Sequence, residues 1–259
     1  MATFLWNDIV FGPIHSRRVG TSLGINLLPL SGKVCTFDCI YCECGANSAG
    51  APAAQRIMPS LGQVSNALEK RFSELSEAGE KIDSISFTGN GEPTLHRSFP
   101  EIVERTVRLR DQYFPEAVIS VFSNSTTLGR PGVFDALMKI DNRIMKVDCC
   151  DPDLVDLINN PAGNFNLESV LRDLERFKGD FILQTMFFKG SVNGREFDLT
   201  SPELVEGWMS IVRRLRPAKI MAYSIDRDTP VAGLQKIPRE RLKEIAAPLR
   251  DEGFKIEIY

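Results

Sequence analysis

Three cysteines with the spacing C-x3-C-x2-C carry the chemistry that this sequence indicates most clearly. They are Cys35, Cys39 and Cys42, and an aromatic residue precedes the third. Three thiolates can hold three irons of a 4Fe–4S cluster, which leaves the fourth iron without a protein ligand. Clusters that only transfer electrons normally keep four cysteine ligands. The spacing therefore predicts a cluster that binds and reduces a small molecule at its open iron.

Two other interpretations account for these cysteines less well. A zinc site would use a C-x2-C pair and a second pair elsewhere. Cys149 and Cys150 are adjacent and lack the spacing of such a pair. Incidental free thiols rarely gather at this density in a reducing compartment. Only one residue separates Cys44 from Cys42, so we interpret Cys44 as a neighbouring thiol and not as a fourth ligand.

The composition is that of an ordinary globular protein. The chain has 259 residues, of which 43% are hydrophobic and 25% charged, enough for one large α/β domain. We expect no membrane contact, because no apolar run approaches the roughly 20 residues that span a bilayer. The N-terminus lacks a signal-peptide pattern, which favours a cytoplasmic location. A net charge of −3 and a pI near 5.6 disfavour a dedicated nucleic-acid binder.

Strand-length apolar runs alternate with helix-period segments along most of the chain. The expected strands cover residues 22–28, 82–88, 117–123, 143–149, 181–188, 219–225 and 254–259. The expected helices cover residues 60–78, 98–113, 131–140, 167–178, 201–216 and 238–252, with Ser60, Asn166 and Ser201 at three of their starts. Such alternation is typical of parallel strands joined by helical crossovers. It fits an open doubly wound sheet as well as a full or partial (β/α) barrel.

Polar groups follow the ends of successive expected strands, where both arrangements place functional loops. The cysteine loop follows the first strand, and the turn at residues 89–94, GNGEPT, follows the second. Glycines let the backbone approach a ligand closely, and carbonyls with a carboxylate can accept hydrogen bonds from an ammonium group. Ser123 and Asn124 end the third strand, where they suit ribose or carboxylate contacts or an ordinary turn.

The cysteine motif and this glycine–glutamate turn together resemble the radical S-adenosylmethionine (SAM) enzymes. The resemblance covers roughly residues 10–226. It implies an α/β fold, a partial (β/α)6-type TIM-like barrel of parallel strands with outer helices. One radical SAM domain would span residues 1–259, with its core at about 20–226 and a C-terminal helix and strand at 238–259. By this resemblance, SAM chelates the open iron through its amino and carboxylate groups, and the amino group is held by Gly89, Asn90, Gly91 and Glu92.

Other parts of the expected site come from strand alternation and from the same resemblance. Ile144, Lys146, Asp148 and Cys150 share one face of their strand, so we expect Asp148 and Cys150 to face the interior and Cys149 to pack in the core. The resemblance implies that Asp148 helps to hold SAM or its surroundings and that Tyr41 flanks the adenine. Gln184 is the lone polar residue of an apolar strand and needs a partner such as the ribose. His96 is expected to serve a loop or a cap.

A narrower resemblance begins upstream of the cysteines. Residues 11–24, the turn at residues 89–94 and the segment at residues 223–230 look like the subgroup of the tRNA wyosine-base synthases and their uncharacterised bacterial relatives. Wyosine synthases carry extra cysteines before the main motif, and this chain has none before Cys35. In the upstream segment, His15, Arg17 and Arg18 either grip a substrate carboxylate or phosphate or merely pack and pair beside the barrel.

The resemblance implies a reaction that starts with one electron from a low-potential flavodoxin or ferredoxin. The cluster would cleave SAM reductively to a 5′-deoxyadenosyl radical, which takes a hydrogen atom from a small molecule or a modified nucleoside. A tRNA substrate fits this scheme, but the acidic pI disfavours it. One alternative is an activase of a glycyl-radical enzyme, although known activases carry D-x-K on the fourth strand and Asp148 is followed by two cysteines. A second alternative is an Fe–S electron carrier, which requires a fourth cysteine ligand.

Overall fold

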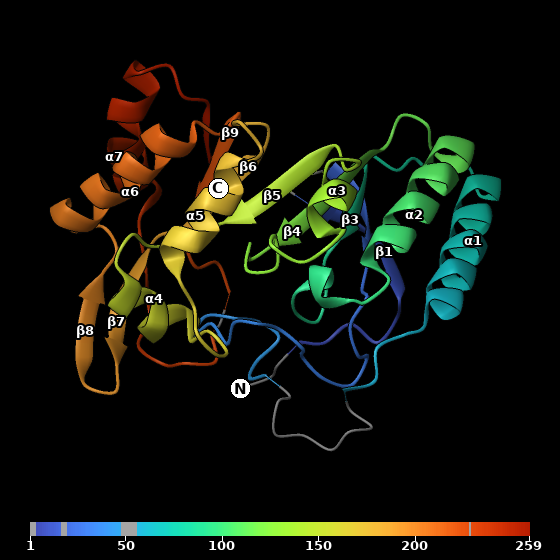
Figure 1. The fold of residues 1–259 in the computed structure, drawn as a ribbon, viewed down its shortest axis with the longest axis horizontal. Coiled ribbons are helices and arrows are strands. Elements are labelled where there is room, and N and C mark those ends of the chain that lie inside the picture. Colours follow the sequence, from blue (N-terminus) through green and yellow to red (C-terminus); the bar gives the residue numbers. More distant parts are fainter. Residues whose placement is uncertain (1–3, 17–19, 48–55, 228) are drawn as a thin grey trace.

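Eight strands form the main sheet of the computed structural model, which describes residues 4–16, 20–47, 56–227 and 229–259 (Figure 1). In sheet order they are β1 (Val10–Ser16), β2 (Gly20–Ile25), β3 (Ser84–Phe87), β4 (Val118–Ser123), β5 (Asn142–Lys146), β6 (Ile182–Met186), β9 (Lys219–Tyr223) and β11 (Ile256–Ile258). From β2 onward every neighbouring pair is parallel, and only β1 pairs in the antiparallel direction.

The strand order identifies the architecture. Neighbouring strands follow one another in chain order without reversal, whereas a doubly wound sheet reverses its order at a switch point. The helices of the described residues are α1 (Leu61–Glu77), η3 (Pro93–Leu95), α2 (Phe99–Tyr113), α3 (Val133–Leu137), α4 (Pro152–Asn159), α5 (Leu167–Glu175), α6 (Pro202–Leu215) and α7 (Arg239–Asp251). The expected α/β fold, a partial barrel of parallel strands with outer helices, is therefore confirmed.

The expected helix starts agree with the structure at the level of single hydrogen bonds. Ser60 forms a capping box with Gln63, in which each side chain bonds the backbone N–H of the other. The Asn166 side chain accepts a hydrogen bond from the Ser169 N–H at 2.8 Å. Ser201 precedes α6 as expected, but its side chain makes no capping hydrogen bond.

Several elements were not expected from the sequence. The expected strand at residues 181–188 divides into β6 and β7 (Phe188–Val192), and β7 belongs to a separate sheet in the order β10-β7-β8. In that sheet β8 is Arg195–Asp198 and β10 is Gln235–Lys236. The turn between β7 and β8 is Asn193-Gly194, with φ values of 52° and 79°, a strong hairpin signal. This hairpin lies at the opposite end of the molecule from α1 and α2 (Figure 1).

The two faces of the parallel sheet bury different side chains. Residues such as Leu23, Ile85 and Met145 contribute to the main core that the outer helices cover. Ile144, Ile182 and Met221 form a small cluster of their own. Because residues two apart share a face of a strand, the neighbours of this second cluster on the same face, Lys146 on β5 and Gln184 on β6, point to the inside of the barrel.

None of the helices in the described ranges has both the length and the apolar character that crossing a bilayer would require.

Candidate cofactor site

A cavity of about 160 Å³ lies at the carboxyl ends of the barrel strands. The three motif cysteines line it together with most of the other expected site residues. Its lining residues are Lys33, Cys35, Phe37, Cys39, Tyr41, Cys42, Cys44, Gly89, Gly91, Glu92, Phe122, Ser123, Asn124, Lys146 and Gln184. Of the residues expected in the site, only Asn90 and Asp148 are missing from this lining.

The cysteine loop is joined to the glycine turn by a short piece of strand pairing. The Val34 N–H donates to the Asn90 carbonyl at 3.0 Å, and the Glu92 N–H donates to the Val34 carbonyl at 3.1 Å. Gly91 has φ +133°, and a Cβ at this position would lie 2.0 Å from the Val34 carbonyl oxygen. Only glycine allows both this backbone conformation and this approach. The glycine is therefore required to bring the turn and the cysteines together.

The other side of the cysteine loop is held by the C-terminus of α4. The Asp38 N–H donates to the Asn159 carbonyl at 2.8 Å and the Ile40 N–H to the Ile158 carbonyl at 3.0 Å. The last carbonyls of a helix lack hydrogen-bond partners within the helix. These bonds therefore give the C-terminal carbonyls of α4 their partners and also fix the cysteine loop. The sequence analysis did not predict α4, although Asp151 caps it with hydrogen bonds from the N–H groups of Asp153 and Leu154.

Inside the loop, an ion pair between buried Lys33 and partly exposed Asp38 fixes the backbone around the cysteines. The Lys33 ammonium group donates to Asp38 Oδ1 and to the Gly45 carbonyl, each at 2.9 Å. Burial opposes the charge of Lys33, but Cys42 and Asp38 outweigh it and raise its pKa. Hydrogen bonding from Cys44, together with the Lys33 charge, lowers the pKa of Cys42 to about 6 despite the burial of Cys42. These contacts favour the thiolate form of Cys42, which is the form that binds metals.

Hydrogen-bond donors surround the other two motif sulfurs. Cys35 Sγ accepts from the Phe37 N–H and from Asn124 Nδ2, both at 3.4 Å. Cys39 Sγ accepts from Lys146 Nζ at 3.2 Å and from Asn159 Nδ2 at 3.4 Å. Burial and the nearby Glu92 carboxylate raise the pKa of Cys35 to about 12, so this thiol releases its proton only when a cation replaces it.

The motif residues offer cysteine thiols, the donors that iron–sulfur clusters use as thiolates. In the described part of the chain, no three His, Cys, Asp or Glu side chains converge on a point where one ion could bind. A cubane needs no such convergence, because each thiolate binds a different iron. Three thiols on one cavity wall, with N–H donors on two of them, match that requirement.

Glu92 supports the glycine turn from inside the protein. Only 2% of the residue is exposed. Its Oε1 accepts from the Thr94 N–H at 3.2 Å and from Ser123 Oγ at 3.0 Å, and its Oε2 accepts from the Asn124 N–H at 2.6 Å. Burial raises the pKa of Glu92, while these hydrogen bonds act in the opposite direction. The carboxylate therefore joins the loop after β3 to the loop after β4.

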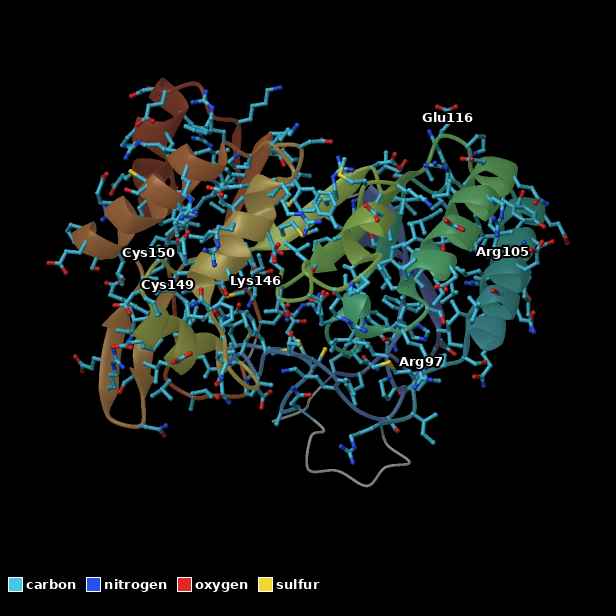
Figure 2. All side chains as sticks on the ribbon, in the orientation of Figure 1. Arg97, Arg105, Glu116, Lys146, Cys149 and Cys150 are labelled. Carbon is cyan, nitrogen blue, oxygen red and sulfur yellow. The ribbon has the colours of Figure 1, made fainter. Side chains whose placement is uncertain are left out.

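Replacing Glu92 with alanine should lower the free energy of unfolding by about 2 kcal/mol, measured by urea denaturation of the metal-free protein. The loss arises because two buried N–H groups lose their acceptor at about 1–3 kcal/mol each, partly offset by removal of a buried charge. The control is Glu116→Ala at an exposed position (Figure 2), which should stay within about 0.5 kcal/mol of the unchanged protein. Equal stability of the two variants would contradict the bracing role of Glu92.

Asn90 is placed differently from the rest of the expected SAM turn. Its side chain is fully buried and donates to the carbonyls of Trp6 and Pro29, both at 2.9 Å, and accepts from the Trp6 N–H. Its amide thus anchors the N-terminal segment, and its backbone carbonyl holds Val34.

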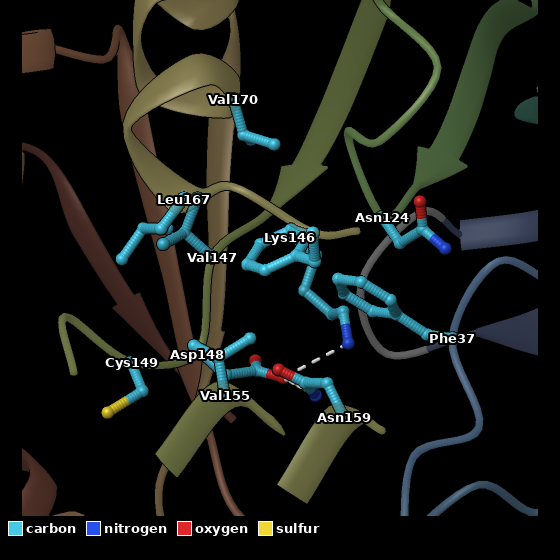
Figure 3. Close-up of a pocket in the computed structure, with 11 residues that line it drawn as sticks. Phe37, Asn124, Lys146, Val147, Asp148, Cys149, Val155, Asn159, Leu167 and Val170 are labelled. Atoms are coloured by element: carbon cyan, nitrogen blue, oxygen red, sulfur yellow. Dashed lines mark hydrogen bonds and ion pairs between the residues drawn. The ribbon is translucent and has the colours of Figure 1, made fainter. Parts of the chain in front are cut away.

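Asp148 lies just behind the cavity wall and reaches the cavity through Tyr41 and Lys146. Its Oδ2 accepts from the Tyr41 hydroxyl, from Asn159 Nδ2 at 2.9 Å and from Lys146 Nζ at 3.1 Å, and its Oδ1 accepts from the Met186 N–H at 3.2 Å. Figure 3 shows Asp148 between Lys146 and Asn159. Lys146 and Asn159 are site residues that the sequence analysis missed. A lysine on the same face as Asp148, within an apolar strand, was the signal for the first.

Gln184 is among the residues that line the cavity. The residue is 7% exposed and lines the cavity from β6. Among the described residues its side chain has no hydrogen-bond partner. Ser123 and Asn124 also line the cavity, but their polar atoms are largely engaged with Glu92, Ser125, Thr36 and Thr126.

The remaining cysteines differ in their surroundings. Cys44 is a neighbouring thiol on the cavity wall, bonded to the Gly89 carbonyl at 3.4 Å. Cys149 is 3% exposed within the main core, as expected. The prediction that Cys150 faces the interior was wrong. Its Sγ contacts the Leu204 carbonyl at 3.7 Å and packs against Gly207 of the outer helix α6, because β5 ends at Lys146 and strand alternation stops there.

The two histidines play no part in the cavity lining. His96 is buried and caps η3. Its Nδ1 accepts from the Ser98 N–H and its Nε2 lies 2.7 Å from the Pro59 carbonyl, so the expected capping role is confirmed. His15 is an exposed residue of β1. Arg17 and Arg18 lie outside the described residues.

Curated proteins with similar sequences include two from the UPF0026 family. The chain is 34% identical to the UPF0026 protein MJ1312 of Methanocaldococcus jannaschii over 192 residues, which are 73% of this chain and 56% of that protein. It is 31% identical to a UPF0026 protein of Helicobacter pylori over 222 residues, 85% of this chain and 67% of that protein. The chain thus spans only about half the length of the first relative. No family model matches the chain.

Solved structures of similar fold include proteins described as radical SAM enzymes. A radical SAM methyltransferase from Sphaerobacter thermophilus matches with a TM-score of 0.63 and 14% identity, over 92% of this chain and 65% of that one. The protein anSMEcpe with bound AdoMet matches with a TM-score of 0.59 and 14% identity, over 91% and 63%. An archaeal TYW1 matches with a TM-score of 0.51 and 13% identity, over 89% and 71%. At these identities the likenesses show a shared fold.

Proposed function

The chain belongs to the UPF0026 protein family, and we propose that it is a radical SAM enzyme that uses a 4Fe–4S cluster to act on a small molecule or a modified nucleoside. The observation that carries the proposal is the meeting of three thiols and a glycine turn on one cavity wall. The sharing of a fold with radical SAM enzymes supports it. We extend the proposal to one functional domain over residues 1–259 and to a cytoplasmic location.

In this proposal Cys35, Cys39 and Cys42 hold three irons of the cluster. When bound, the cluster and SAM would supply reductive cleavage of the sulfonium and hydrogen abstraction from the substrate. A low-potential flavodoxin or ferredoxin would supply the electron. The protein orients these groups and keeps water from them, since the cavity lies inside the open end of the barrel.

The other cavity residues would hold SAM itself. The backbone at Gly89 and Gly91, which lines the cavity, would accept from the ammonium group of SAM, with Glu92 fixing the turn from behind. Gln184 lines the cavity from β6, and its amide would bond a ribose hydroxyl. Tyr41 would flank the adenine, with its hydroxyl already committed to Asp148 and Lys146. Asn90 and Asp148 would act through their neighbours and not by direct contact.

The proposed substrate is either a small molecule or a modified nucleoside. The upstream and C-terminal segments that resemble the wyosine-synthase subgroup favour a nucleoside, and the net charge of −3 disfavours a tRNA polyanion. The archaeal TYW1 likeness concerns the fold alone. Bulk tRNA and a small-molecule extract are therefore the two fractions to compare as substrates.

Anaerobic reconstitution with iron and sulfide, followed by addition of SAM and dithionite, tests the enzymatic proposal. We expect 5′-deoxyadenosine and methionine to form only when cluster, SAM and reductant are all present, and to form faster with the fraction that holds the substrate. A reconstituted protein that binds iron and accepts electrons but never cleaves SAM would instead support the electron-carrier alternative.

A further inference from the structure

Lys146 donates a hydrogen bond to the motif cysteine Cys39. Lys146 Nζ lies 3.2 Å from Cys39 Sγ at the end of β5. We propose that Lys146 is a positioning residue whose charge-assisted hydrogen bond to the Cys39 thiolate raises the reduction potential of the cluster and so eases the entry of the electron. This inference rests on the proposed function, because it requires that Cys39 bind the cluster.

The geometry leaves the lysine no freedom to point elsewhere. Its ammonium group has three N–H donors, and three acceptors surround it: Cys39 Sγ at 3.2 Å, the Tyr41 hydroxyl at 2.9 Å and Asp148 Oδ2 at 3.1 Å. The Phe37 ring centroid lies 4.6 Å from Nζ and the Tyr41 ring centroid 5.4 Å. The side chain is only 12% exposed. Each donor therefore has one assigned acceptor.

Asp148 alone does not explain the presence of a lysine here. Its carboxylate is fully buried, and the Tyr41 hydroxyl, Asn159 and the Met186 N–H already donate to it. These three donors would satisfy Asp148 without a lysine. Its negative charge instead stabilises an ammonium group in a place where burial would otherwise disfavour one. The pair holds a positive charge beside a sulfur ligand.

A second donor points at the same sulfur. Asn159 Nδ2 lies 3.4 Å from Cys39 Sγ and also bonds Asp148. Cys39 thus receives one charged and one neutral side-chain donor, whereas the side-chain donor on Cys35 is the neutral amide of Asn124. Cys39 therefore has a charged side-chain donor that Cys35 lacks.

The physical consequence is a shift toward the reduced state. Hydrogen bonds to cluster sulfurs tune the potential, and reduction adds one negative charge to the cluster. A positive donor in a water-poor pocket stabilises that added charge more than it stabilises the oxidised state. Removing the donor should therefore disfavour reduction.

Potentiometric titration of the reconstituted holoprotein, followed by electron paramagnetic resonance, tests this role without substrate turnover. We expect Lys146→Met to lower the equilibrium constant for one-electron reduction about tenfold, which corresponds to a potential about 59 mV more negative. Lys146→Arg keeps a charged N–H donor and should restore most of the shift. The matched control is Lys219→Met on β9, which removes the same charge from an ion pair with Glu257 and should leave the potential unchanged.

The outcomes separate this inference from the proposed function. Equal potentials for Lys146→Met and the unchanged protein, with full iron content in both, would overturn the role of Lys146 and leave the enzymatic proposal intact. Failure of the unchanged protein to assemble a cluster would overturn the proposed function. If Lys146→Met does not assemble, Asn159→Leu removes the other donor. A lower potential in that variant supports stabilisation of Cys39 by hydrogen bonds, and an unchanged potential overturns it.

Discussion

Replacing Cys39 with serine should reduce cluster iron and sulfide to background after anaerobic reconstitution, with loss of the visible absorption of the cluster. Cys39 is one of the three motif thiols among the four that line the cavity, and a serine hydroxyl is a far poorer ligand than a thiolate at neutral pH. The same result is expected for Cys35→Ser and Cys42→Ser. Iron and sulfide analysis per chain is the measurement.

The matched control for the cysteine variants is Cys44→Ser in the same cavity. Cys44 bonds the Gly89 carbonyl and is not assigned to iron, so this variant should keep its cluster. Loss of the cluster in Cys44→Ser together with a retained cluster in Cys39→Ser would contradict the assignment of ligands. Loss with all four variants would indicate four thiolate ligands and favour the electron carrier.

Replacing Gly91 with alanine should lower the free energy of unfolding by about 3 kcal/mol or more and also reduce cluster assembly. Its φ of +133° is strained for any residue with a side chain, at about 1–3 kcal/mol. A Cβ there would lie 2.0 Å from the Val34 carbonyl oxygen and 2.6 Å from its carbon. The turn and the cysteine loop must then move apart. Urea denaturation and iron content measure the two effects.

Gly62→Ala provides the control for the glycine variant. Gly62 lies in α1, and its nearest neighbour for a new Cβ is Ser60 Oγ at 4.0 Å. Alanine should therefore be neutral or stabilise the helix by up to about 1 kcal/mol. If Gly91→Ala behaves like Gly62→Ala in both measurements, the close approach at Val34 is not what holds the cysteine loop.

The expected site residues that the structure brings to one cavity are those encoded by local spacing. The three cysteines and the glycine turn each follow a strand, and parallel strands end at one rim, so their meeting follows from topology. The same reasoning from strand ends and alternation pointed to Ser123 and Gln184, and both line the cavity. These predictions needed only the order of the strands and helices and the two-residue alternation of side chains along a strand.

What the sequence did not predict depended on where elements stop. The expected strand 143–149 ends at Lys146, so alternation failed for Cys150, and Asp151-Pro152 begins α4 instead. Without α4 there was no way to place Asn159 beside Cys39. The sequence analysis placed Lys146 on the correct face of its strand. It looked for a lysine only after Asp148, in the D-x-K order of the activases, and so gave no role to the lysine that precedes Asp148.

Mössbauer spectroscopy of the reconstituted protein, recorded with and without SAM, tests the central claim most directly. If three thiolates hold the cluster and leave one iron open, a single iron site should change its signal when SAM is added, while the other irons keep theirs. A spectrum that SAM leaves unchanged, with every iron already coordinated by sulfur from the protein, would contradict the account.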